Sequence, residues 1–161
     1  MTDIKIKFQL GDTEIECVKN EVLQMGLVKN MIEDIDDEIV IPLDLNEKTF
    51  SSIIEFNKTH LNTDFTEINY EDIEYEFSNN DFDFIKKFDF NETITLMNAC
   101  DFLNHKLLLK LAIQHFTTLM TDENKEWLEN YICEKYKDEN KEESDNEESD
   151  DNDNDNNSDD E

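Results

Sequence analysis

The chain has no arginine, one proline and two glycines among its 161 residues. Without arginine it lacks the planar side chain that grips a phosphate or carboxylate through two parallel hydrogen bonds, so functions that need such a clamp are disfavoured. The shortage of proline and glycine leaves few chain breakers and favours a helix-rich domain. No run approaches the ~18 apolar residues of a membrane span, and the first residues show no signal-peptide pattern.

Cysteine is also scarce. Cys17, Cys100 and Cys133 are odd in number and far apart, with no CxxC pair and no histidine at metal-ligand spacing from any of them. We therefore expect free thiols in an intracellular protein, cytoplasmic or nuclear, without a metal site. A glycine-rich phosphate loop, an HExxH motif and a GxSxG motif are likewise missing. The sequence predicts no catalytic residue, no cofactor and no enzymatic activity.

Negative charge is abundant and gathers at the C-terminus. Residues 138–161 hold 14 Asp or Glu and one Lys, with no aliphatic or aromatic side chain. Such a segment buries too little apolar surface to offset the entropy of ordering it, so we expect a disordered acidic tail after a domain at 1–137. The tail accounts for −13 of the formal charge of −29. Both parts should repel phosphate backbones and anionic lipids, which predicts no nucleic-acid partner and no membrane partner.

The N-terminal third carries the pattern of a small sheet. Apolar and charged residues alternate over 4–8, which predicts a half-buried strand. A turn signal at 11–12 leads into a second short strand over 15–18, so the two form a hairpin. A third β-rich run at 39–41 stops at Pro42.

The remainder is mostly helical in its periodicity. Apolar residues recur at three- and four-residue steps, and predicted helices cover 27–32, 46–60, 91–102, 108–119 and 123–136. Candidate N-caps are Asn20, Asn46, Asn91 and Asp122. Residues 82–90 suit a short helix or turn, and 61–81 is predicted to be an acidic insertion loop. The expected class is α+β, with a small three-stranded sheet packed with helices.

Four segments carry a family resemblance. IKIKFQLGDTEIECV resembles the first hairpin of the S-phase kinase-associated (Skp) adaptor family, and LVKNMIED resembles that family's next helix. IVIPLDLNEKTFSSIIEFNKTH resembles its third strand and following helix. DFIKKFDFNETITLMNACDFLNHKLLLKL resembles its later helix pair. The resemblance spans roughly residues 4–120, and elongin C is a related second match.

The resemblance implies a BTB/POZ-like fold and a non-catalytic adaptor that links a cullin to an F-box or other substrate receptor in an SCF ubiquitin ligase. It places Asp101, Phe102, Asn104 and His105 at a helix junction that binds cullin. It places Phe116, Leu119, Met120, Trp127 and Ile132 on a receptor-binding apolar surface. The same five side chains would equally suit an internal core, and the sequence leaves both interpretations open.

Beyond residue 120 the chain departs from the family. One degenerate helix and the acidic tail stand where the family has two helices that help to hold the F-box. Two alternatives therefore remain. One is a BTB-type interaction or decoy module, similar to elongin C, that binds cullin without F-box recognition. The other is an acidic chaperone whose tail binds basic proteins.

Overall fold

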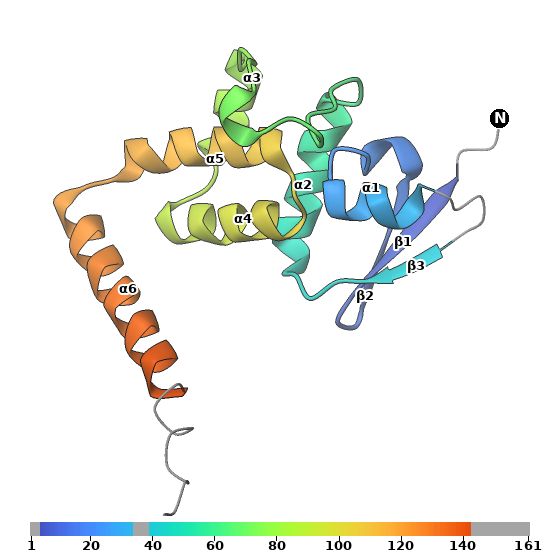
Figure 1. Ribbon diagram of the computed structural model, residues 1–161. Coiled ribbons are helices and arrows are strands. Elements are labelled where there is room, and N and C mark those ends of the chain that lie inside the picture. The colour runs from blue at the N-terminus through green and yellow to red at the C-terminus, as the bar shows by residue number, and fades with distance from the viewer. Residues whose placement is uncertain (1–3, 34–38, 143–161) are drawn as a thin grey trace, which may run out of the picture. The chain divides into compact units, whose positions relative to one another are not determined.

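The computed structural model describes residues 4–33 and 39–142, and the chain divides into two compact units, Met1–Met120 and Thr121–Glu161. The described residues form six α-helices and one three-stranded sheet (Figure 1). This confirms the predicted α+β class. The second unit contains helix α6 (Asp122–Glu142), which runs five residues into the segment predicted to be a disordered tail. The rest of that predicted tail lies outside the described residues.

The sheet has β1 (Lys5–Leu10) at its centre. β2 (Thr13–Val18) pairs antiparallel with β1 on one side, and β3 (Ile39–Pro42) pairs parallel with it on the other. Gly11 closes the hairpin with a φ of +58°, which glycine adopts without a steric cost. Alternate residues of β1 are buried, as the period-two pattern predicts. The hairpin and the third strand lie where the sequence predicts them.

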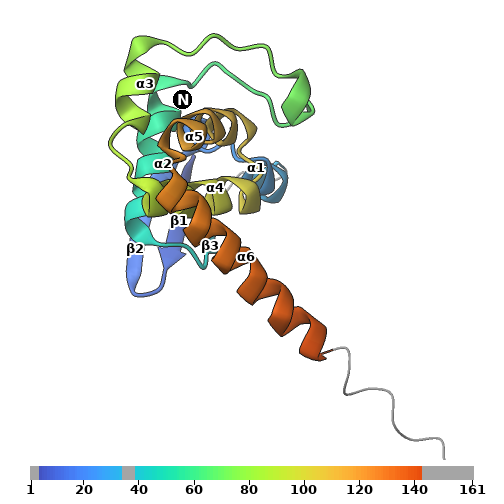
Figure 2. The same cartoon turned by 90° about the vertical axis from the view of Figure 1, so that its left-hand side faces the viewer.

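Five helices complete the first unit. They are α1 (Gly26–Ile32), α2 (Glu47–Thr59), α3 (Asn79–Ile85), α4 (Phe90–Phe102) and α5 (Lys106–Leu119). The ring centroids of Phe8 in β1 and Phe50 in α2 are 4.8 Å apart, so α2 packs on the sheet through aromatic contacts. α4 and α5 lie side by side (Figures 1 and 2). Their adjacent ends form the junction predicted to bind cullin.

Helix capping confirms one sequence prediction and corrects another. The Asn46 side chain accepts a hydrogen bond from the Thr49 amide at 3.1 Å and caps α2, as predicted. The predicted cap of α4, Asn91, is wrong. Asp89 accepts from the Glu92 amide at 2.8 Å, and Glu92 accepts in return from the Asp89 amide at 3.2 Å. This reciprocal capping box satisfies two donors at once, which starts α4 at the residue after Asp89.

The predicted insertion is an ordered segment rather than a free loop. Residues 61–77, named the strap here, arch over α5 (Figure 2). The Lys106 ammonium on α5 donates to the carbonyl oxygens of Thr66 and Ile68 at 2.7 and 2.6 Å. Ile73 is only 2% exposed and anchors the strap to the core. Hydrogen bonds from a lysine and an apolar anchor therefore order an acidic sequence.

Candidate functional site

The junction between α4 and α5 is closed by backbone hydrogen bonds. Asn104 has a φ of +53°, in the left-handed region that asparagine tolerates better than most residues. The Asn104 amide donates to the Asp101 carbonyl at 3.0 Å, and the His105 amide donates to the Cys100 carbonyl at 2.8 Å. This pair of bonds is a Schellman motif, which ends one helix and fixes the direction of the next. The exposed residues around it are held by a rigid backbone.

Helix α1 supports the same junction from the side. It begins at Gly26 rather than after Asn20, which lies in a short 3-10 helix, η1 (Lys19–Glu21). The Gly26 amide and the next amide donate to the carbonyls of Asn104 and Leu103 at 3.2 and 3.1 Å. A β-carbon at position 26 would lie 2.5 Å from the Asn104 side-chain nitrogen. A larger residue at position 26 would therefore require the Asn104 side chain to shift.

His105 is fully buried beneath the junction. Its Nδ1 accepts from the Leu108 amide at 3.3 Å, so the neutral ring carries its proton on Nε2 and donates it to Asn57 Oδ1 at 2.6 Å. Asn57 in turn donates to the Glu21 carbonyl at 2.8 Å. Burial lowers the pKa of His105 to about 4. The His105 side chain thus caps α5 from the interior and, unlike the other predicted cullin-binding residues, does not reach the surface.

The other three residues predicted to bind cullin are exposed. Phe102 exposes 51% of its surface, and Asp101 and Asn104 flank it. Phe102 is one of the side chains that line a surface hollow of about 390 Å³. The hollow is lined by Asp44, Leu45, Asn46, Thr49, Thr95, Asn98, Ala99 and Phe102. An exposed aromatic ring with polar neighbours, on a backbone that cannot shift easily, suits contact with another protein.

Three of the residues predicted to bind a receptor belong to the first unit. Phe116 and Leu119 lie on α5 and Met120 follows it, and each is partly exposed. The Phe116 ring stacks on Phe90, with centroids 5.2 Å apart and planes at 25°. Phe116 therefore belongs partly to the packing between α4 and α5, which corresponds to the core interpretation that the sequence left open.

The other two residues of that set belong to α6 in the second unit. Trp127 and Ile132 are each 43% exposed. The Trp127 ring stacks on Tyr131 at 5.3 Å, nearly parallel. The Thr121 hydroxyl accepts an amide hydrogen bond in the first turn at 3.3 Å, so Thr121, rather than the predicted Asp122, caps the helix. A receptor surface that combines α5 with α6 stays a prediction.

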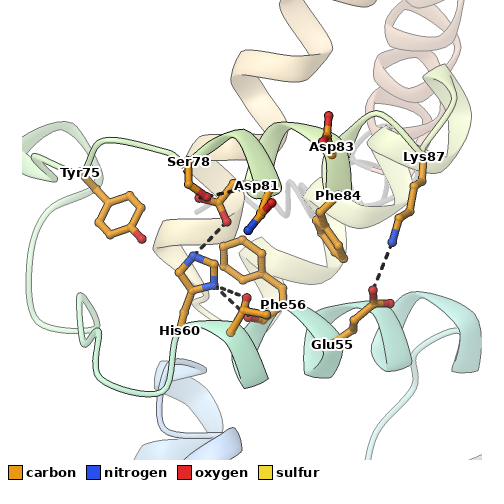
Figure 3. A pocket seen from close by; sticks show the side chains of 11 residues that line it. Glu55, Phe56, His60, Tyr75, Ser78, Asp81, Asp83, Phe84 and Lys87 are labelled. Atoms are coloured by element: carbon orange, nitrogen blue, oxygen red, sulfur yellow. Dashed lines mark hydrogen bonds and ion pairs between the residues drawn. The ribbon is translucent and has the colours of Figure 1, made fainter.

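A second hollow was not predicted from the sequence. This cleft, of about 370 Å³, lies between α2, α3 and the strap (Figure 3). The cleft exists because helix α3 begins at Asn79, inside the range predicted as a loop. The ring of Phe84 on α3 packs against the ring of Phe56 on α2. The signal was present in the sequence, because Ser78 and Asp81 have the spacing of a capping box.

A buried pair forms the floor of this cleft. Asp81 accepts from the Ser78 amide and hydroxyl at 2.7 and 2.8 Å, and its other oxygen lies 3.1 Å from Nε2 of His60. On the far side of the ring, Nδ1 of His60 lies 2.9 Å from the Phe56 carbonyl. The Thr59 hydroxyl also lies 2.8 Å from the same Nδ1, so both ring nitrogens have hydrogen-bonding partners. The pair ties the end of α2 to the start of α3.

The buried thiols are poorly suited to chemistry. Burial raises the pKa of Cys17 to about 11 and raises that of Cys100 further. A thiol with a raised pKa stays protonated and is a weak nucleophile. Neither side chain is thus a candidate for covalent catalysis.

Within residues 4–33 and 39–142, no three His, Cys, Asp or Glu side chains come together as a metal site. No helix in that part of the chain is long and apolar enough to cross a membrane. No protein-family model and no curated protein sequence matches the chain.

Proposed function

We propose that this chain is a non-catalytic adaptor of the Skp type, with a BTB/POZ-like fold, that joins a cullin to an F-box-type substrate receptor in a ubiquitin ligase. The cullin binds at the α4–α5 junction through Phe102, Asp101 and Asn104. His105 contributes indirectly, because it fixes the start of α5 from within.

The observation that carries the proposal is the exposure of Phe102 on a braced backbone. About half of this large apolar side chain is open to solvent, although other residues of α4 are buried in the core. Two independent sets of hydrogen bonds, the Schellman motif and the α1 amides, hold the junction in place. A rigid aromatic group with polar neighbours loses little entropy on binding, which is the property of an interface hot spot.

The order of elements supports the fold part of the proposal. A hairpin, a helix, a third strand, a second helix, the strap, the short helix α3 and then the α4–α5 pair follow one another along the chain. Apart from α3, this is the order that the resemblance implies. The sequence NACDFLNHK, part of the segment that most strongly resembles the family, lies at the α4–α5 turn.

The first prediction concerns Phe102. Phe102→Ala should weaken the affinity for a cullin N-terminal region by about 2 kcal/mol, roughly 30-fold, because it removes the apolar anchor. The thermal unfolding midpoint should stay nearly unchanged, since an exposed ring contributes little to the core. Isothermal titration and circular dichroism measure the two effects.

A matched control is Phe82→Ala on α3, where the ring is 38% exposed. This substitution removes the same atoms from a different surface, so the cullin affinity should remain within about twofold of that of the unmodified chain. Equal losses in the two variants would show that Phe102 has no special role, and the proposed cullin site would be wrong.

A further inference from the structure

We propose that the cleft between α2, α3 and the strap binds a single arginine side chain of a partner protein. The inference does not depend on the adaptor role, because it concerns a different surface and different residues. At about 370 Å³ the cleft is near the lower limit for ligand pockets, so it suits one long side chain better than a cofactor.

The cleft has a floor that holds its shape. Asp81 and His60 are 4% and 7% exposed, and their polar atoms are engaged with each other and with neighbouring backbone. The Phe56 ring stacks on His60, with centroids 4.0 Å apart and planes at 18°. Because these buried groups already have partners, an incoming side chain would contact the other lining residues, among them Glu55, Tyr75 and Phe84 (Figure 3).

A cation already occupies one end of the mouth. The Lys87 ammonium lies 3.1 Å from a Glu55 carboxylate oxygen and 5.3 Å from the centroid of the Phe84 ring. The mouth thus provides a carboxylate and an aromatic face together, the combination that recognises a cationic side chain. Both partners of the ion pair are about 60% exposed. Such an exposed ion pair is weak, so a better-fitting cation can displace the Lys87 ammonium from Glu55.

Arginine fits these groups better than lysine. Its planar guanidinium donates two parallel hydrogen bonds to one carboxylate and stacks on an aromatic ring at the same time. The chain itself has no arginine, so the occupant must come from another molecule. Asp83 on the cleft wall, Glu74 and Glu76 beside Tyr75, and the net charge of −29 all favour the approach of a cation.

The test is a titration of the full-length, ¹⁵N-labelled chain with N-acetyl-arginine amide, followed residue by residue by NMR. We expect saturable shifts of amides in 55–60 and 78–87. N-acetyl-citrulline amide has nearly the same shape without the charge and should produce no saturable shift. N-acetyl-lysine amide should bind more weakly than the arginine compound. Shifts spread evenly over all acidic surfaces, or equal binding of citrulline, would overturn the proposal.

Variants locate the binding group. Glu55→Gln should weaken arginine binding about fivefold, and Lys87→Met should strengthen it about twofold by removing the internal competitor. Glu71→Gln removes the same charge from an exposed strap position outside the cleft and should leave the affinity unchanged. If Glu55→Gln and Glu71→Gln have equal effects, or if Lys87→Met weakens binding, the cleft is not the site.

Discussion

Replacing Asn57 with alanine is expected to destabilise the chain by about 3 kcal/mol. The Asn57 side chain accepts from His105 at 2.6 Å and donates to the Glu21 carbonyl at 2.8 Å, in an interior where it is 0% exposed. The substitution removes these partners from the buried His105 ring N–H and from the partly buried Glu21 carbonyl, and a buried polar group left without a partner costs roughly 1–3 kcal/mol. Because His105 caps α5, the loss should also loosen the junction that carries Phe102.

Urea unfolding followed by circular dichroism measures this effect. Asn62→Ala, at an exposed position, is the control and should change the free energy of unfolding by less than about 0.5 kcal/mol. The double variant Asn57→Ala/His105→Ala should be more stable than the sum of the single losses predicts, because each substitution removes part of the same network. Simple additivity would mean that the bond between the two side chains contributes little.

The second large effect is a loss of stability in acid that depends on His105. Burial lowers its pKa from 6.5 to about 4 in the folded state, with the nearby His60 acting in the same direction. Between these values the unfolded chain binds a proton that the folded chain does not, so the free energy of unfolding falls as the pH falls. At pH 4 this difference amounts to about 3 kcal/mol relative to neutral pH.

His105→Gln isolates this contribution. Glutamine puts a polar side-chain amide in place of the imidazole and does not titrate, and both proteins keep the same 43 Asp and Glu residues. Urea unfolding at a series of pH values from 7 to 4 should show a smaller fall in stability for the variant, by about 3 kcal/mol at pH 4. Parallel curves for the two proteins would contradict a buried, neutral His105.

The strands were predictable because their signals are local. The alternation in β1 and the turn at Gly11 lie within a few residues of one another, and the β-rich run before Pro42 is equally compact. The α4–α5 turn was also found, since Asn104 and His105 interrupt the apolar periodicity. The sequence predicted that the three strands form one small sheet, but it did not predict that β3 runs parallel to β1.

The features that the sequence did not show depend on distant partners. His105 was placed on the surface because its bond to Asn57, 48 positions away, leaves no local pattern. The strap was predicted as a charged loop because the lysines that hold it, Lys106 and Lys110, lie far away in the sequence on α5. The cleft was missed for the same reason, since its walls come from α2 and α3. The positions of His105, the strap and the cleft therefore depend on contacts between residues that are far apart in the sequence.

The most direct test of the adaptor role is co-elution from a size-exclusion column with light scattering, using the full-length chain, a cullin N-terminal region and an F-box protein at micromolar concentrations. We expect one complex that holds one copy of each protein, and we expect that the cullin and the F-box protein do not co-elute when the chain is left out. A complex of chain and cullin that excludes the F-box protein would instead indicate a decoy module. If the chain elutes alone, without cullin, the adaptor proposal is wrong.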